Sequence, residues 1–340
     1  MEAVTQFAWV PQQPPAGTTK KMDHMTGAQA GGAPSALPLV SVLIASRDRP
    51  ELLLQCLASV LAQQYPRFEI VVFDDASRQN LADRLAGRFG QAPILWTRSE
   101  QRLGVTGSRN HLIQDAAGEI LVFLDDDAAL EDPLALQSVA RYFATIPKLG
   151  TLAFKIIVSV NGRTSLQVPF SRRWLKKIPS LTERTTQVAY YLGAGHAMRK
   201  EVFQRCGLYQ QDLVYGDEEL DHAYRQIEAG FSLVYAPEIV VRHCPASSLV
   251  RLDGEGGYRI YCLVRNRIWN GYKHIPFPYV VSYLGTWILY FLALGLREGC
   301  VGEALRGIFA GIAAFRNLPR RHLDKEAVAY LKRNYGRLWY

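Results

Sequence analysis

A buried strand that runs directly into three carboxylates is the feature that most constrains this chain. Ile120–Leu124 is continuously apolar, and Asp125, Asp126 and Asp127 follow it without a break. Like charges this close repel one another, and a divalent cation held by oxygen ligands would relieve the repulsion. The alternative is a solvated acidic turn that caps the next helix, because helix N-termini favour Asp. The acidic tip by itself fits both interpretations.

The first part of the chain alternates apolar strands with helices. Leu39–Ala45 and Phe68–Phe73 are typical of strands buried on both faces, and a shorter strand is expected at Ile94–Trp96. The alternation predicts an α/β fold with a mostly parallel central sheet flanked by helices. Polar strand tips then converge at one edge and favour a nucleotide pocket: Ser46-Arg47, Asp74-Asp75 and Asp125-Asp126-Asp127. No glycine-rich phosphate loop is present, so diphosphate would need another partner, such as a metal.

Composition narrows the class of protein and its division into domains. Hydrophobic residues make up 49% of the 340, which suits a globular core. The five cysteines are scattered without a CxxC pair, which argues against a disulfide framework and against a zinc site. The N-terminal stretch is rich in Pro, Gly, Ala and Gln and lacks the pattern of a secretory signal. We expect a disordered arm over 1–38, an α/β domain over 39–250 and a helical region over 251–340.

Several motifs in order resemble the family 2 glycosyltransferases, which have the GT-A fold. The resemblance covers roughly Leu39–Leu249 and rests on four stretches: Val40–Pro50, Asp74–Ser77, Leu103–Asn110 and Phe123–Ala128. It is closest to bacterial transferases that build cell-surface polysaccharide, rhamnosyltransferases among them. The resemblance implies an inverting enzyme with a nucleoside-diphosphate sugar donor, UDP- or dTDP-linked, and with Mn²⁺ or Mg²⁺ as cofactor.

The resemblance also implies roles for the donor site. The first strand tip would lie against the nucleobase, and Asp75 would accept a hydrogen bond from the base. Arg109 would point into the donor pocket, and Asp127 would be the first metal ligand. Asp125 or Asp126 would take ribose hydroxyls or a metal-bound water, with Asp125 also a candidate ligand. The other donor-binding candidates are Ala45, Ser46, Arg47, Arg49, Gly193 and Gly195.

A second acidic run follows later in the chain. Glu218-Glu219-Leu220-Asp221 resembles the acidic element that supplies the general base of the family, with Glu219 in the position of the base. Glu218 and Asp217 are competing candidates, and Asp221 belongs to the same catalytic element. These carboxylates also fit the plain interpretation of acidic residues in a helix's first turn. His243, at the end of a predicted strand pair over Phe231–His243, would complete the metal site.

The last part of the chain is basic and apolar. From Arg251 to Tyr340 there are fourteen Lys/Arg and six Asp/Glu, an excess of eight that equals the net charge of the whole chain. A basic amphipathic helix is expected over Tyr258–Asn270, and Ile275–Leu296 holds no charged residue in 22 positions. With Ile308–Phe315, these stretches predict a helical hairpin at the inner face of the membrane, and a membrane surface is favoured over nucleic acid as partner. The alternatives are a soluble helical domain, or one or two true spans.

We therefore expect transfer of one sugar to a glycan or a polyprenyl-diphosphate-linked acceptor. The Q-x-x-R-W element of processive synthases is absent, which favours a single addition. The irregular stretch Thr151–Tyr191 includes a basic segment, Ser171–Lys177, and would form either the acceptor side or a solvated loop. The alternatives are a sugar nucleotidyltransferase, which would need a glycine-rich basic loop after the first strand, and a non-catalytic sugar- or membrane-binding relative.

Overall fold

A computed structural model describes residues 37–90, 92–245 and 256–338. The arm predicted for 1–38 therefore lies almost wholly outside the described residues. The boundary predicted near residue 250 also falls outside them, in 246–255. Both divisions of the chain stay predictions.

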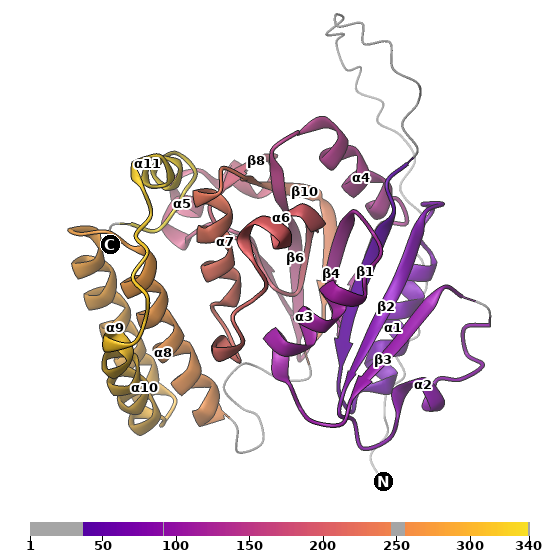
Figure 1. Ribbon diagram of the computed structural model, residues 1–340, viewed down its shortest axis with the longest axis horizontal. Coiled ribbons are helices and arrows are strands. Elements are labelled where there is room, and N and C mark those ends of the chain that lie inside the picture. The colour runs from indigo at the N-terminus through magenta and orange to yellow at the C-terminus, as the bar shows by residue number, and fades with distance from the viewer. Residues whose placement is uncertain (1–36, 91, 246–255, 339–340) are drawn as a thin grey trace, which may run out of the picture. The chain divides into compact units, whose positions relative to one another are not determined.

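The first half is the predicted alternation of strands and helices (Figure 1). Its elements are β1 (Val40–Ser46), α1 (Pro50–Leu61), β2 (Phe68–Asp75), α2 (Leu81–Arg84), β3 (Ile94–Ser99), α3 (Gly104–Asp115) and β4 (Ile120–Asp125). β1 lies between β2 and β4 and is parallel to both, with Ser46 opposite Asp74 and Ala45 opposite Asp125. The predicted convergence of these strand tips at one edge is confirmed. Helix α2 is short and ends at Arg84.

The second half makes the sheet mixed. Its elements are β5 (Ala128–Leu130), α4 (Ala135–Thr145), β6 (Leu149–Val160), β7 (Arg163–Gln167), α5 (Arg172–Lys177), η1 (Pro179–Glu183), β8 (Thr186–Val188), β9 (Gly195–Arg199), α6 (Lys200–Cys206), η2 (Gln211–Leu213), α7 (Glu218–Glu228) and β10 (Ser232–His243). The strand order is β3-β2-β1-β4-β9-β6-β10-β5, with β7 on β6 and β8 on β10. β9 runs antiparallel to β4 and β6, and β5 runs antiparallel to β10.

Asn161 and Gly162 join β6 to β7 in a hairpin turn, with φ of 49° and 73°. The predicted strand pair over Phe231–His243 is wrong, because β10 is one strand. Its register against β6 shifts between Ala236 and Val240, beside Pro237. Proline has no N–H to donate to the ladder, so the strand bulges there and then continues.

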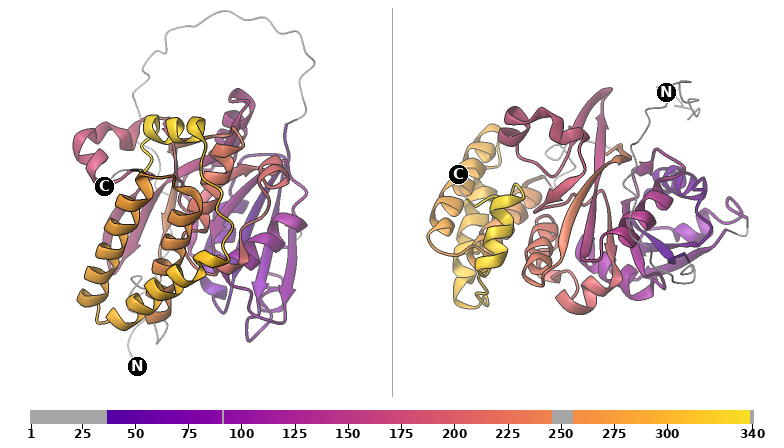
Figure 2. Two further views of the ribbon diagram at one scale, coloured as in Figure 1. Left: turned by 60° about the vertical axis from the view of Figure 1, so that its left-hand side comes forward. Right: turned by 90° about the horizontal axis from the view of Figure 1, so that it is seen from above.

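The C-terminal elements are α8 (Gly256–His274), α9 (Tyr279–Arg297), α10 (Val301–Ala313), η3 (Ala314–Arg316) and α11 (Lys325–Arg333). Helices α8, α9 and α10, orange to yellow in Figure 2, pack against one another, and α7 contacts both α8 and β10. Apolar side chains from this region, such as Tyr283 and Leu331, join the core cluster that contains Tyr224 of α7. The helices therefore share a core with the sheet.

The predicted helical hairpin is present as α9 and α10. Within the described parts of the chain, α9 is the one helix long and apolar enough to cross a membrane by length and composition, with a mean hydropathy of 1.6. About a fifth of that window is buried in the protein (22%), and several further residues of α9, such as Trp287 and Leu292, pack against the core while Leu289 and Tyr290 are exposed. A single helix of this kind is weak evidence for a span.

Candidate active site

The acidic tip and β10 meet at the edge of the sheet. Asp125 ends β4, and Ala128 begins β5 with His243 as its antiparallel partner. This pairing places Nε2 of His243 2.9 Å from Oδ1 of Asp127 and 3.9 Å from Oδ2 of Asp125. One ligand atom from each of the three residues lies within 4.8 Å of the others. The three residues predicted as metal ligands are therefore neighbours.

The electrostatics of this cluster suit a cation. Burial alone would raise the pKa of Asp127, but the hydrogen bond and charge of His243, with the charge of Arg49, lower it. Burial alone would lower the pKa of His243, but Asp127 and then Asp125 raise it. Both shifts come from the attraction between the carboxylates and positive charge, which is the property that a cation site needs. Two carboxylates and one imidazole form a donor set that fits Mn²⁺ or Mg²⁺, with nitrogen favouring Mn²⁺.

Asp126 points to the first strand tip. Its Oδ2 accepts a hydrogen bond from Oγ of Ser46 at 2.6 Å, and its Oδ1 lies 2.9 Å from Nη1 of Arg49. Burial raises the pKa of Asp126 to about 7, although Arg49 and Ser46 oppose the rise. Arg49 Nη1 also lies 3.1 Å from Oδ2 of Asp127. Asp126 therefore links the β1 tip to the acidic tip, and it is not part of the three-residue cluster.

The two aspartates at the end of β2 have different hydrogen-bond partners. Asp74 accepts hydrogen bonds from the backbone N–H groups of Ser77 and Leu81 and from Arg98, so it serves the turn. Asp75 accepts from the N–H groups of Leu103 and Gly104, where α3 begins. Both side chains are buried. The contact between Asp75 and a nucleobase stays a prediction, as do those of Ala45 and the half-exposed Arg47.

Arg109 connects the acidic tip to the second acidic run. Its Nη1 lies 3.0 Å from Oε1 of Glu218 and 3.3 Å from Oε1 of Glu219, and its Nη2 lies 3.6 Å from Oδ1 of Asp125. Nη2 also donates to the carbonyl of Gly193 at 3.1 Å. The guanidinium is buried, and burial would lower its pKa, but Glu219 and Glu218 raise the pKa overall. Arg109 therefore lies between the candidate metal ligands and the candidate bases.

Glu218 and Glu219 differ in burial and in their distance to Arg109. Glu218 is the more deeply buried of the two and lies closer to the guanidinium. Burial, and next the charge of Glu219, raise the pKa of Glu218 well above its usual range. Gly193 lies directly against the pair, because a Cβ on Gly193 would come within 2.1 Å of Oε1 of Glu219. The absence of a side chain at Gly193 leaves room for that carboxylate.

Asp221, Gly195 and His196 lie in packed parts of the fold. Asp221 is fully buried and its oxygens contact side chains of α7 and α8, and a catalytic role for it stays a prediction. Gly195 was expected to line the sugar pocket, but a Cβ on it would meet Val241 at 2.8 Å, so its bare face allows strand packing. His196 is buried, bonds the carbonyl of Leu192 and stacks on Phe123 at 4.7 Å, which makes it a core residue.

The polar face of α8 was not predicted from the sequence. Helix α8 was expected only as a basic amphipathic helix for the membrane. In the structure, its polar side chains contact the segment that begins α7, among them Asn266, Arg267, Asn270, Lys273 and His274. The available signal was the spacing of Asn266, Asn270 and His274, which places three polar groups on one helical face.

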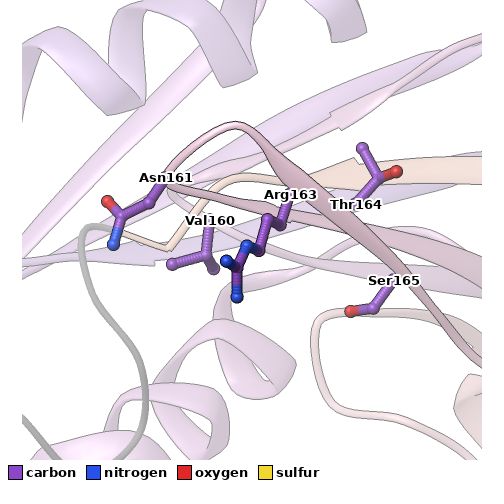
Figure 3. A pocket seen from close by; sticks show the side chains of 5 residues that line it. All are labelled: Val160, Asn161, Arg163, Thr164 and Ser165. Carbon is purple, nitrogen blue, oxygen red and sulfur yellow. The ribbon is translucent and has the colours of Figure 1, made fainter.

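An open hollow lies on the surface of the described part of the chain. It is lined by the β6–β7 hairpin, as Figure 3 shows, through Val160, Asn161, Arg163, Thr164 and Ser165. Val158 of β6 is the parallel register partner of His243, and Val160 follows two residues later. The hairpin therefore extends past the candidate metal cluster at the same edge of the sheet.

The chain belongs to the glycosyltransferase family 2. The family model described as "Glycosyltransferase like family 2" matches residues 38–254, which is more than half of the chain. The α/β architecture, with its central mixed sheet, is that of GT-A glycosyltransferases. The predicted family and fold class are confirmed, and the chain is a nucleotide-sugar transferase by family.

Relatives and a solved structure support this placement. The glycosyltransferase AglE of Haloferax volcanii is 26% identical over 243 residues, which are 68% of this chain and 77% of that protein. An Escherichia coli UDP-Glc:alpha-D-GlcNAc-diphosphoundecaprenol beta-1,3-glucosyltransferase, WfgD, is 31% identical over 100 residues, 29% of this chain and 39% of that protein. The crystal structure of GalNAc-T7 with UDP, GalNAc and Mn²⁺ has a TM-score of 0.58 at 19% identity and covers 83% of this chain and 59% of that one.

Proposed function

We propose that this chain is a metal-dependent, inverting glycosyltransferase that moves one sugar from a UDP- or dTDP-sugar to a hydroxyl group of a glycan or lipid-linked acceptor. The observation that carries the proposal is the continuous line from His243 and Asp127 through Asp125 and Arg109 to Glu219. This line joins the candidate metal ligands to the carboxylate of Glu219. The metal ligands would act on the donor, and the carboxylate would take the proton of the acceptor hydroxyl.

The donor side consists of the strand tips and the candidate metal ligands. Asp125, Asp127 and His243 would hold Mn²⁺ or Mg²⁺, which supplies Lewis-acid neutralisation of the diphosphate leaving group. Asp126, Ser46 and Arg49 hold one another at the neighbouring tip and keep the acidic turn in place. Asp75, at the end of β2, would meet the nucleobase.

Glu219 is the proposed general base. It would accept the proton of the acceptor hydroxyl as that oxygen bonds to the anomeric carbon and the bond from this carbon to the diphosphate oxygen breaks. Attack opposite the leaving group inverts the anomeric centre. Glu218 is the more buried of the pair and lies closer to Arg109, so it is less accessible to an acceptor hydroxyl. Arg109 orients the carboxylate, and Gly193 leaves room for it.

The β6–β7 hairpin and α5 support the proposed acceptor, and α9 and α10 support the proposed location of the protein at the membrane. The hollow of the β6–β7 hairpin and the basic helix α5 with Trp174 would contact a glycan or its diphosphate. The Escherichia coli relative is named for a diphosphoundecaprenol-linked acceptor, which supports a lipid-linked acceptor here. Exposed apolar side chains on α9 and α10 suit contact with the inner face of the cell membrane: Val281, Leu289, Tyr290, Leu296, Leu305, Phe309 and Ile312.

The test is a donor panel followed by stereochemistry. The purified chain with Mn²⁺ is offered UDP-glucose, UDP-galactose, UDP-N-acetylglucosamine and dTDP-rhamnose, with a polyprenyl-diphosphate sugar as acceptor. Nucleotide release coupled to product formation, with the opposite anomeric configuration in the NMR spectrum of the product, is the expected result. Retention of configuration would contradict the proposed mechanism.

A further inference from the structure

The segment that leads into α7 has an unusual backbone. Gly216 and Asp217 both have positive φ, 79° and 66°, and α7 begins at the next residue. Left-handed conformations are uncommon for a residue with a side chain, so neighbouring contacts must fix this one. Asp217 occupies the capping position, yet its side chain makes no hydrogen bond to the helix N–H groups. The contacts that fix the corner Tyr215–Asp217 come from α8.

Three side chains of α8 hold this corner. Nε and Nη2 of Arg267 each lie 2.5 Å from an oxygen of the Asp217 carboxylate, a bidentate pair. Nδ2 of Asn270 donates to the carbonyl of Asp217 at 2.8 Å. Nδ2 of Asn266 donates to the carbonyls of Tyr215 and Gly216, at 3.0 and 2.8 Å. All three carbonyls of the corner are therefore fixed by one helix.

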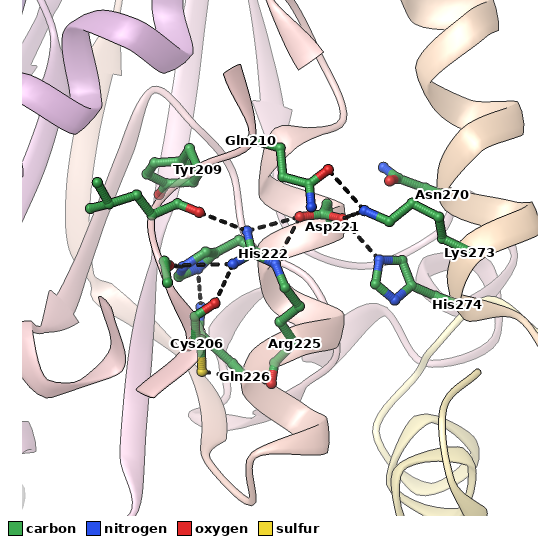
Figure 4. A network of polar contacts seen from close by, with 12 residues as sticks. Cys206, Tyr209, Gln210, Asp221, His222, Arg225, Gln226, Asn270, Lys273 and His274 are labelled. Atoms are coloured by element: carbon green, nitrogen blue, oxygen red, sulfur yellow. Dashed lines mark hydrogen bonds and ion pairs between the residues drawn. The ribbon is translucent and has the colours of Figure 1, made fainter. Parts of the chain in front are cut away.

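A second set of contacts holds α7 one turn further on (Figure 4). Asp221 lies 2.7 Å from Nζ of Lys273 and 2.9 Å from Nε2 of His274, both on α8. On its other side, Asp221 pairs with Arg225 at 2.8 Å. Glu218 and Glu219 lie between Asp217 and Asp221 in the sequence. The first turn of α7 is thus held on both sides of the two glutamates.

The Arg267 guanidinium is itself held in place. It lies over the ring of Trp287 in α9, at 3.8 Å from the ring centroid. A planar guanidinium stacked on an indole keeps its edge free for bidentate bonding, which an ammonium group would not reproduce. A lysine at this position would keep the positive charge but could not reproduce the paired hydrogen bonds to both oxygens of Asp217.

We propose that α8 is a positioning element for catalysis, in which Arg267 and Asn270 fix the Asp217 corner and so aim Glu219 at the acceptor hydroxyl. The inference rests on the proposed function, because it takes Glu219 as the base. In a positioning role, α8 affects the chemical step more than it affects donor binding, since the donor tips lie on β1, β2 and β4. A structural role alone would lower stability without separating these two quantities.

The test compares Arg267→Lys and Asp217→Asn with the unchanged chain. Arg306→Lys is the matched control, because Arg306 is an exposed residue of α10 that carries the same substitution away from the corner. Asn270→Ser, which removes one hydrogen bond and no charge, replaces either variant that does not fold. Three quantities are measured with Mn²⁺ present: UDP affinity by calorimetry, hydrogen exchange of peptides over 216–224, and kcat and KM for the donor that turns over in the panel.

The expected result is faster exchange over 216–224 and a kcat at least about tenfold lower, with UDP affinity and donor KM within about threefold of the unchanged chain. Arg306→Lys changes none of these. Unchanged exchange, an unchanged kcat, or a matching loss of UDP affinity would each overturn the inference. Glu219→Gln runs in parallel: if it keeps full turnover, the base assignment fails, and the exchange data still show whether α8 holds the corner.

Discussion

His243 Nε2 lies 2.9 Å from Asp127 Oδ1, where the antiparallel pair of β5 and β10 brings together two distant parts of the sequence. The acidic tip therefore acquires a nitrogen donor from the last strand of the sheet. Isolated carboxylates at a strand tip fit a solvated turn as well as a metal site. A partly buried imidazole beside them favours the metal site.

Replacement of the two glutamates should separate their roles. Glu219→Gln is expected to lower kcat by about 10²–10⁴, because the amide cannot take the acceptor's proton. Glu218→Gln changes the more buried carboxyl group and leaves the proposed base in place, so kcat should fall by less than about tenfold. Initial rates of nucleotide release give both values, and Glu228→Gln, at the exposed end of α7, is the control. A larger effect at Glu218 than at Glu219 would reverse the assignment.

A methyl group at Gly193 should disturb the base directly. The new Cβ would lie 2.1 Å from Oε1 of Glu219 and 2.9 Å from Nη2 of Arg109, so both groups must move. We expect kcat to fall by roughly 10²-fold, as a small misplacement of a reacting group does. Gly285→Ala is the matched control, since a Cβ there meets nothing within 4 Å. Equal kcat values for the two variants would show that this space is not needed.

The positions of the strand tips could be predicted from the sequence, because alternating strands and helices force parallel strands to end at one edge. The division between Asp74 and Asp75 was also accessible, since an Asp at a strand end commonly binds its own turn. The continuity of β10 through Pro237 was not accessible, because a bulge depends on the register with β6.

Contacts between distant segments mark the limit of sequence reasoning. The pairing of Arg109 with Glu218 and Glu219 joins α3 to α7, and no local pattern encodes it. Gly195 was expected at the donor site because a residue without a side chain lets a ligand approach the backbone. The same property also lets a neighbouring strand pack closely. The choice depends on Val241, which lies across the sheet.

Acid should destabilise the fold through buried neutral histidines. Burial, and next the charge of Arg225, lower the pKa of His222 to about 3. Its folded-state pKa lies below the unfolded value of about 6.5, so the unfolded chain binds the extra proton, and stability is lost as the pH falls below about 6.5. Between pH 6.5 and 5, protonation of His222 should lower the free energy of unfolding of the unchanged chain by about 2 kcal/mol. His222→Asn should lack this part of the decrease when both proteins are unfolded in urea. An identical pH slope in both proteins would contradict this.

The apolar face of α9 and α10 should bind anionic membranes. Leu289→Asp combined with Phe309→Asp places charges on two side chains that are 69% and 70% exposed, so the fold should tolerate them. We expect sedimentation with phosphatidylglycerol vesicles at low salt to fall at least about tenfold, because both apolar burial and attraction to anionic lipid are lost. Leu166→Asp on β7 is the control, and equal sedimentation of all three proteins would contradict a membrane role for this face.

Calorimetric titration of UDP, dTDP and GDP into the chain, with and without Mn²⁺, tests the metal-held donor site most directly. We predict that at least one nucleotide binds only when Mn²⁺ is present, and that Asp127→Ala weakens that binding at least about tenfold through loss of a ligand. Asp83→Ala, the same change at an exposed residue of α2, should leave it unchanged. Nucleotide binding that needs no metal and is unaffected by Asp127→Ala would contradict the site formed by Asp125, Asp127 and His243.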